Sequence, residues 1–303
     1  MLPARVGAQA PAKLRVAGTS ANDIIGALWA QRSGLFQKYG LDVEIINSTS
    51  GAAVTAAVLG NSLEIGKSSV FGLITAYAKG VPIVLEANAA IYTAEAPNTA
   101  IVIAKESPAK TGRDMNGKIF AVPGLGDLNT MTTSAWLDAN GGDSRSVKFL
   151  ELPGPAVVEA IAAGRIDGAA LTEPQLTDAV RSGKTRILGY PDDAIGKRLL
   201  VTAYFCTAEY AAKNAGVLAR FRKGVNEATI YANAHRSEMI PVIANYSKVD
   251  PATVAALSPA LLAAPGALDP RLIQPWIDTA VKYRVLPKPF NAREMIDPAA
   301  LTL

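Results

Sequence analysis

Residues 118–137, KIFAVPGLGDLNTMTTSAWL, contain an apolar run, a turn with two glycines and a stretch with helical spacing of apolar residues. The run KIFAV predicts a strand, and the stretch from Asn129 predicts a helix that ends at Asn140 and Gly141. Free N–H groups lie at the start of such a helix, so this arrangement can bind a nucleotide or any other small anion. The rest of the sequence distinguishes these two uses.

Two stretches approach nucleotide-binding motifs without completing them. The turn Gly124–Asn129 lacks the third glycine of the dinucleotide motif, which permits close packing of the helix on the strand. In Gly60–Ser68, GNSLEIGKS, five residues separate the glycines where a phosphate loop has four, and LEI favours a strand. The sequence therefore argues against a nucleotide and leaves another small anion.

Apolar residues alternate along the chain between the period of a strand and the period of a helix. This rhythm predicts an α/β fold with mostly parallel sheets flanked by helices. The expected strands are 14–18, 41–46, 63–66, 82–89, 99–104, 118–122, 146–152, 167–172 and 198–206. The expected helices are 22–36, 51–60, 70–80, 129–142, 154–164 and 174–183, and the chain from Ala208 onward is expected to be helical.

The chain contains two similar units. Residues 57–64, AVLGNSLE, align with residues 160–167, AIAAGRID, at an offset of 160 − 57 = 103 residues. Each copy ends a helix at a residue that tolerates the left-handed conformation, Asn61 or Gly164, and then begins a strand. The capping residues match as well as the apolar pattern. We therefore favour two similar α/β units, one in each of two lobes of the protein, over a chance similarity between two helix ends.

The composition excludes several classes of protein. Only 18% of the 303 residues are charged, the net charge is +4, and the basic residues are scattered. Nucleic-acid and membrane-surface sites need clustered basic residues, so neither partner is expected, and no apolar run approaches the roughly 18–20 residues of a membrane span. The one cysteine, Cys206, and the one histidine, His235, exclude an intramolecular disulfide and any metal site with several such ligands. We therefore expect neither a metal nor a cofactor.

Catalytic motifs are also scarce in the sequence, which contains no G-x-S-x-G, H-E-x-x-H or C-x-x-C. Cys206 lies in a predicted strand, where a buried and inert thiol is expected. His235 lies in a polar helical stretch, which favours a solvent-facing side chain over a general base. A non-catalytic function is the simpler expectation, and Asp127 is the acid that we would test as a catalytic group.

Short hydroxyl and amide residues follow the predicted strands, where the helices start. For any one of them, capping of a helix N-terminus is the simplest role. Ligands of open α/β sheets bind outside the carboxyl ends of the strands, so together these residues predict several helix starts that converge on one anion. The candidate ligand-binding residues of these loops are Thr19, Ser20, Asn22, Ser50, Lys67, Ser68, Ser69, Asn88, Gly126, Asp127, Asn129, Thr130 and Glu173.

Six stretches, in order along nearly the whole chain, resemble the periplasmic solute-binding proteins of ABC importers. The resemblance is to their nitrate/sulfonate/taurine and thiamine-pyrimidine-precursor branch. The stretches are AQRSGLFQKYGLDVEI (30–45), AAVLGNSLEIG (56–66), AKGVPIV (78–84), RDMNGKIFAVPG (113–124), AIAAGRIDGAALTEP (160–174) and RVLPKPFNAREMIDPAAL (284–301).

The resemblance implies a two-lobed periplasmic-binding-protein fold of type II. Each lobe is expected to be a mostly parallel sheet flanked by helices, with two hinge crossings near residues 98–101 and 201–205. The lobes would comprise residues 11–98 with 206–303, and residues 99–205. Residues 1–10 contain the small-residue patterns VGA and AQA, so they are expected to be the remnant of a removed export signal or a disordered tail.

The resemblance also implies positions in a binding site. This sequence departs from the family at Asn61, where glycine is usual, and at Lys67, where a neutral residue is usual. We interpret Lys67 as a mark of an acidic ligand. Tyr204, on the returning crossing strand, is expected either to stack on an aromatic ligand or to pack in the core. Positions that match the family's pocket loops are Ser20, Asn22, Ser68, Ser69, residues 126–130 and, at the cleft rim, Glu173.

The function implied by the resemblance is non-catalytic capture of a small organic anion, a carboxylate or sulfonate, in the cleft between the lobes. A monomer in the periplasm would deliver this small-molecule ligand to an ABC permease with its ATPase. The alternatives are an enzyme of the same fold, of the menaquinone-pathway or pyrimidine-forming type, and a ligand-sensing domain. The pyrimidine synthases of this superfamily consume an active-site His and use a Cys-rich segment, so one His and one Cys argue against that activity.

Overall fold

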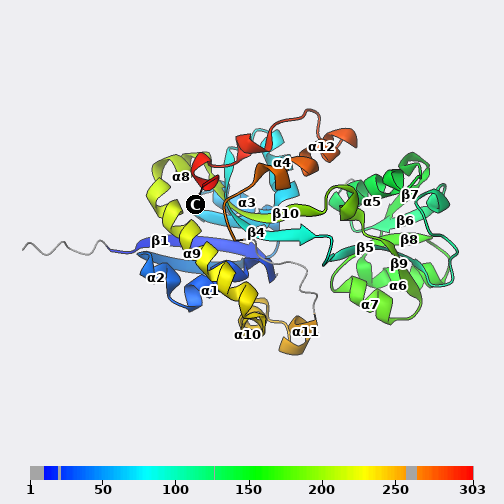
Figure 1. The fold of residues 1–303 in the computed structure, drawn as a ribbon, viewed down its shortest axis with the longest axis horizontal. Coiled ribbons are helices and arrows are strands. Elements are labelled where there is room, and N and C mark those ends of the chain that lie inside the picture. The colour runs from blue at the N-terminus through cyan, green and yellow to red at the C-terminus, as the bar shows by residue number, and fades with distance from the viewer. Residues whose placement is uncertain (1–9, 20–21, 126, 257–264, 303) are drawn as a thin grey trace, which may run out of the picture.

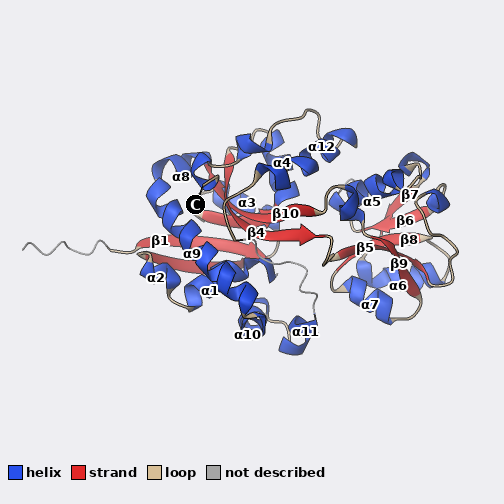
Figure 2. Ribbon diagram, viewed as in Figure 1, coloured by secondary structure: helices blue, strands red, loops and turns tan. Residues whose placement is uncertain are grey.

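Two five-stranded sheets form the framework of the computed structural model, which describes residues 10–19, 22–125, 127–256 and 265–302 (Figure 1). Helices flank both sheets (Figure 2), so the expected two-lobed α/β fold is confirmed. The first sheet, in the order β2-β1-β3-β10-β4, contains β1 (Ala12–Thr19), β2 (Leu41–Ser48), β3 (Ile65–Ser69), β4 (Ile83–Thr93) and β10 (Arg198–Thr207). The second sheet, in the order β7-β6-β8-β5-β9, contains β5 (Thr99–Ala104), β6 (Ile119–Val122), β7 (Lys148–Glu151), β8 (Gly168–Thr172) and β9 (Thr185–Gly189).

The helices of the two lobes come from separate parts of the chain. Those of the second lobe are α5 (Leu128–Ala139), α6 (Gly154–Ala162) and α7 (Gln175–Arg181). Those of the first lobe are α1 (Ile25–Arg32), α2 (Leu35–Lys38), α3 (Gly51–Leu59), α4 (Val70–Ala78), α8 (Ala208–Lys213), α9 (Ala215–Ala234), α10 (Arg236–Ser247), α11 (Pro251–Ala256) and α12 (Gln274–Lys282). Short 3₁₀ helices are η1 (Asn22–Ile24), η2 (Arg113–Met115), η3 (Ser144–Ser146), η4 (Pro191–Ala194), η5 (Pro270–Leu272), η6 (Ala292–Met295) and η7 (Pro298–Ala300).

The strand pairing directs the carboxyl ends of both sheets toward the crossings. β1 pairs parallel with β2 and β3, and β10 pairs antiparallel with both β3 and β4, so β4 runs in the direction of β1–β3. β4 then leads directly into the second sheet. There β6, β7 and β8 are parallel, and β8 ends beside the start of β5, where Thr99 pairs with Thr172. We call the carboxyl-end edges of the two sheets the facing edges.

The crossings are two short segments that lie side by side. Residues 94–98 join β4 to β5, and residues 190–197 join β9 to β10. The backbone N–H of Ala94 donates to the carbonyl of Lys197 at 2.9 Å, which ties the two segments together.

The crossings were predicted too far along the chain, at residues that belong to strands of the two sheets. The first was predicted at 98–101, but β5 already pairs with β8 from Thr99. The second was predicted at 201–205, but β10 pairs with β4 from Arg198, so these residues belong to the first sheet. Residues 199–206 are apolar except for Thr202, and a buried strand of this kind gives no signal of which part of it crosses between the lobes.

Three further elements differ from the sequence prediction. The expected helix 22–36 is divided into η1, α1 and α2, with Gly34 at a φ of 78° between the two α-helices. β3 extends to Ser69, so part of a predicted loop is strand. β9 was not predicted, because it is a five-residue edge strand without a clear alternation of buried and exposed residues.

Each sheet has an apolar core on both faces. In the first lobe the long helix α9, within the part of the chain expected to be helical, covers one face of the sheet and buries Leu218, Phe221, Val225 and Ala228 there. Two smaller apolar clusters flank the second sheet. The two predicted helix ends also match, since Asn61 has a φ of 56° and Gly164 a φ of 65°. Among the described helices, none combines the length and apolar character needed to cross a bilayer.

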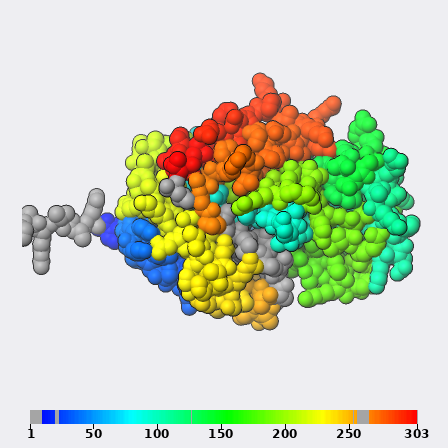
Figure 3. Space-filling model, in the orientation of Figure 1, coloured from blue at the N-terminus to red at the C-terminus, as the bar shows by residue number. Residues whose placement is uncertain are grey.

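The C-terminal segment, residues 265–302, forms a second contact between the lobes in addition to the crossings. Its orange atoms run along the first lobe and reach the green second lobe (Figure 3). There α12 packs near α5, and the Tyr283 hydroxyl donates to Asp138 Oδ2 at 2.7 Å. Met131 of α5 is buried in an apolar cluster that includes Trp276 of α12.

Candidate functional site

Small polar side chains occupy the facing edge of the first sheet. Ser50 precedes α3 and accepts a hydrogen bond from the N–H of Ala53 at 3.1 Å, and Ser69 precedes α4 and accepts one from Gly72 at 3.1 Å. Both serines are exposed and both act as neutral N-caps, as serine commonly does. The half-buried Thr19, at the end of β1, and the buried Ser68, beside Ser69, lie at the same edge.

Lys67 lies at this edge but does not present a free charge. Its side chain is 2% exposed, and its ammonium forms an ion pair with the carboxylate of Asp23, which is 5% exposed. The positive charge expected for an acidic ligand is therefore compensated within the first lobe. Asp23 was not among the predicted site residues. Lys67 directly follows the predicted strand 63–66, in what was expected to be a loop, so no sequence signal pointed to a buried acidic partner.

Tyr204 and Asn88 belong to the interior of the first lobe. Tyr204 is fully buried and packs edge-on against Phe221, with ring centroids 5.4 Å apart, so of its two expected roles the structure places it in core packing.

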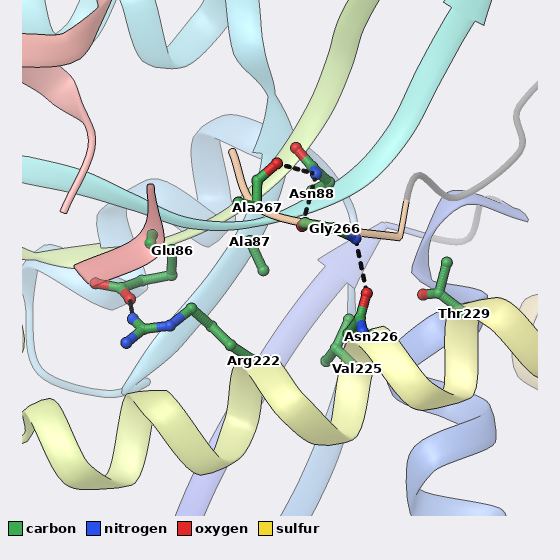
Figure 4. Close-up of a pocket in the computed structure, with 10 residues that line it drawn as sticks. Glu86, Ala87, Asn88, Arg222, Val225, Asn226, Thr229, Gly266 and Ala267 are labelled. Atoms are coloured by element: carbon green, nitrogen blue, oxygen red, sulfur yellow. Dashed lines mark hydrogen bonds and ion pairs between the residues drawn. The ribbon is translucent and has the colours of Figure 1, made fainter. Parts of the chain in front are cut away.

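The Asn88 side chain binds the C-terminal segment. Its Nδ2 donates to the carbonyls of Gly266 and Ala267 at 3.1 and 3.2 Å (Figure 4). The cavity beside it measures about 10 Å³, which holds at most one water molecule and no organic ligand.

Acidic side chains cap two helices at the facing edge of the second sheet. Asp127 Oδ1 accepts a hydrogen bond from the N–H of Thr130 at 2.9 Å at the start of α5. The Thr130 hydroxyl donates to the carbonyl of Gly124 at 2.9 Å, which holds the glycine turn against the helix. Glu173 Oε2 accepts a hydrogen bond from the N–H of Thr177 at 3.1 Å in α7. The half-buried Asn129 lies in the first turn of α5.

The helix α6 differs from α5 and α7 because no side chain caps its N-terminus. Its N-cap is Pro153, and Gly154 begins the helix. This helix was predicted at 154–164, but its start was not among the candidate binding residues. Sequence reasoning selected short hydroxyl and amide residues, and Pro153 and Gly154 offer only backbone groups.

The charges at the helix starts divide the helices into two groups. The positive ends of α5 and α7 are already balanced by carboxylates, whereas the residues at the N-cap positions of α3, α4 and α6 are all uncharged, and we call these three helices neutral-capped. A carboxylate beside a helix N-terminus repels a second anion, so the neutral-capped helices are the ones whose N–H groups and dipoles favour an anion. α3 and α4 come from the first lobe, and α6 comes from the second.

Two carboxyl groups have raised pKa values, one in the core of the first lobe and one within a crossing. Burial raises the pKa of Glu86, in the core of the first lobe, to about 8, although Arg222 Nη1 lies 2.5 Å from its Oε2 (Figure 4). Burial raises the pKa of Asp192, in η4, to about 7.

Cys206 and His235 are as predicted in burial and exposure. The Cys206 thiol is fully buried and donates to Glu86 Oε1 at 3.4 Å, and burial raises its pKa. The His235 ring is exposed and stacks on Tyr231, with ring centroids 3.9 Å apart. Over the described residues, no cluster of three or more His, Cys, Asp or Glu side chains is arranged to hold a metal ion.

Three candidate residues cannot be placed fully. Ser20 and Gly126 lie outside the described residues, and only the backbone of Asn22 is described. Residues 1–9 also lie outside them, so the expected export-signal remnant at residues 1–10 stays a prediction. The structure brings Thr19, Ser50, Ser68 and Ser69 together on one facing edge and places Asp127, Asn129, Thr130 and Glu173 on the other.

Comparisons with known proteins give the same architecture. The aliphatic sulphonate-binding protein SsuA of Escherichia coli, which is periplasmic, superposes with a TM-score of 0.77 at 20% identity, over 95% of this chain and 98% of that one. The periplasmic nitrate-binding protein NrtA of Synechocystis PCC 6803 superposes with a TM-score of 0.71 at 14% identity, over 97% and 88%. Likeness at this identity establishes the fold.

Sequence comparisons add the family. A protein of Brucella abortus (strain 2308), which carries a provisional binding-protein name, is 25% identical over 226 residues, covering 74% of this chain and 68% of that protein. The sequence pattern of the family described as NMT1/THI5 like matches residues 21–239, which is more than half of the chain. The chain therefore belongs to the NMT1/THI5-like family and has the fold of the periplasmic solute-binding proteins.

Proposed function

We propose that this protein captures a small organic anion, an aliphatic or aromatic carboxylate or sulfonate, between its two lobes without changing it chemically. It acts as a monomer in the periplasm and delivers the ligand to an ABC permease with its ATPase. The proposal is supported by the fold, by the family and by relatives whose names state that they bind a sulfonate or nitrate.

The observation that carries the proposal is the set of neutral-capped helix starts at the facing edges. Among the candidate residues described at the facing edge of the first sheet, Lys67 is the cationic one, and Asp23 balances its charge. An anion would therefore be held by N–H groups and hydroxyls, chiefly at α3 and α4, and α6 would meet it when the lobes close. Such a site suits a single negative charge, because partial charges replace a free side-chain cation.

The proposed mechanism is a hinge equilibrium about the two crossings. The lobes would be residues 11–98 with the C-terminal residues, and the segment that starts at Thr99, with the second boundary at residues 190–197. A ligand that contacts both facing edges binds the closed form more tightly and shifts the population toward it. The closed form would be the one that the permease recognises.

A thermal-shift screen tests the capture of an anion. The panel contains propane-1-sulfonate, benzenesulfonate and benzoate, each paired with its uncharged amide. Binding stabilises the folded protein by mass action, by about 2.7 kcal/mol at a concentration 100 times Kd. We expect at least one anion to raise the melting temperature and its amide not to do so. If no anion shifts the melting temperature, the proposal is wrong.

Two matched variants test how the anion is held. Ser69→Asp keeps an N-cap on α4, because Asp caps as well as Ser, but adds a negative charge at the facing edge. Thr207→Asp makes the same change on α8, at the opposite edge of the first sheet, where β10 ends. We expect Ser69→Asp to weaken anion binding at least tenfold and Thr207→Asp to leave it unchanged. Equal affinity of both variants would contradict anion binding at α4.

A further inference from the structure

A buried ion pair connects two neighbouring loops at the facing edge of the first sheet. Lys67 lies near the end of β3, and Asp23 lies in η1, which follows β1. Their side chains are 2% and 5% exposed, so both charges have lost nearly all contact with water. Replacing such a pair with neutral residues is often without cost to stability, because desolvation offsets the attraction between the charges. Stability alone therefore gives little reason for the pair.

The aliphatic part of Lys67 also contacts the end of β1. A Cβ added at Gly18 would lie 3.1 Å from Lys67 Cε and 2.7 Å from Ile24 Cδ1, so the lysine stem and Ile24 lie directly against the backbone of this residue. The Tyr246 hydroxyl also donates to the carbonyl of Gly18, at 2.9 Å. The backbone just before Thr19 is therefore held from β3, η1 and α10.

We infer that Lys67 and Asp23 are positioning residues, whose pair fixes the end of β1 and the start of η1 against the end of β3. The pair thereby holds Thr19 in a fixed position relative to Ser68 and Ser69, which follow Lys67 in the chain. This inference rests on the proposed function, since these three residues belong to the proposed site. Because the two charges cancel, the pair orders the polar surface and does not attract the ligand by its own charge.

Affinity gives this positioning a measurable consequence. A ligand binds only those molecules whose site is already in the competent arrangement, so Kd rises in inverse proportion to the competent fraction. If the end of β1 moves freely relative to β3, the competent fraction falls and the unbound protein must be ordered when the ligand binds.

The double variant Asp23→Asn with Lys67→Met separates positioning from stability. It removes both charges, leaves no unpaired buried charge and keeps side chains of similar size. We expect a free energy of unfolding close to that of the wild type. For the panel anion that gives the largest thermal shift, we expect a Kd at least tenfold higher by titration calorimetry. An unchanged Kd would overturn the inference.

The ion pair of Glu86 with Arg222 provides a matched control. It is equally buried, at 0% and 7% exposure, and joins β4 to α9 in the same lobe (Figure 4). Arg222 also contacts the Asp297 carboxylate at 3.5 Å, so the control variant combines Glu86→Gln, Arg222→Met and Asp297→Asn and leaves no unpaired charge. It should leave the Kd for the same anion within about twofold of wild type, since these residues do not connect the loops at the facing edge. If this variant loses affinity to the same degree, general loosening of the lobe is the cause and the positioning role is wrong.

Hydrogen exchange tests the inference without any ligand. In the unbound protein, the amides of Thr19 and Asp23 should exchange at least tenfold faster in the Asp23→Asn, Lys67→Met variant, and those of α9 should not change. Unchanged exchange at Thr19 would overturn the positioning role even if no panel anion binds. Absence of binding by the wild-type protein would instead count against the proposed function, so the two failures are distinguishable.

Discussion

Replacement of Asp192 by Asn should remove a pH dependence that this carboxyl gives to the stability of the fold. Asp192 lies in η4, within the second crossing, and is 8% exposed. Burial, with a smaller effect of the neighbouring Asp193, raises its pKa from 3.8 to about 7. The folded state therefore holds the proton more tightly than the unfolded state does. Stability from this group is complete below pH 3.8 and is lost as the pH rises toward 7.

The size of the effect follows from the shift in the Asp192 pKa. A shift of about 3 pH units corresponds to about 4 kcal/mol, at about 1.4 kcal/mol per unit. Asn has nearly the same shape and stays neutral, so it avoids the cost of a buried charge. At pH 8 the Asp192→Asn variant should be more stable than wild type by as much as about 4 kcal/mol, and at pH 4 the two should be nearly equal.

Urea denaturation at intervals between pH 4 and pH 8 measures this difference directly. The free energy of unfolding is extrapolated to zero urea for both proteins at each pH, and the two curves should separate steadily between pH 4 and 7. The neighbouring substitution Asp193→Asn serves as the comparison for Asp192→Asn. Unlike Asp192→Asn, which removes a buried acid, it removes a carboxylate that pairs with Lys197 at 2.8 Å and accepts a hydrogen bond from Tyr92. Parallel curves for wild type and Asp192→Asn would refute the reasoning.

Three further substitutions test the packing of the lobes, each by urea denaturation. Lys67→Met alone should cost about 3–5 kcal/mol, because it leaves the Asp23 carboxylate buried without its partner; a loss below 1 kcal/mol would contradict the burial of the pair. Tyr283→Phe should cost about 0.5–1.5 kcal/mol through loss of its 2.7 Å hydrogen bond to Asp138, and no loss would argue against that contact. Gly66→Ala should cost about 1–3 kcal/mol, since its Cβ would lie 2.6 Å from a phenylalanine ring and a valine methyl, and a neutral result would show that the core has room there.

Periodicity predicted most of the fold because the sheets are buried on both faces. Long apolar runs and glycine or asparagine helix ends mark where one element stops and the next begins, as at Asn61 and Gly164. The crossings were misplaced because the polar residues at 94–98 and 190–197 resemble those of any other loop between two strands. β9 was missed because a short edge strand need not be buried. Both errors have the same origin, because the pattern of apolar residues within a segment does not show which sheet the segment joins.

The sequence identified the polar residues at the strand ends of the candidate site, but it did not show which charged residues pair with one another. Serines at strand ends were identified from their position, and Ser50 and Ser69 do cap helices at the facing edge. Whether Lys67 faces a ligand depends on Asp23, which is 44 residues away in sequence, and a linear pattern does not pair them. The start of α6 at Gly154 contributes backbone groups alone, so no side-chain signal identifies it.

The distance between the lobes, measured with and without ligand, tests the central claim most directly. Spin labels can be attached at Ala56→Cys on α3 and Ala162→Cys on α6, both exposed positions, because the natural Cys206 is fully buried. With a saturating concentration of the best panel anion, the distribution of interspin distances should shift to shorter values, and with the matching uncharged amide it should not change. A distribution that stays the same while calorimetry shows the anion bound would contradict capture by closure of the two lobes.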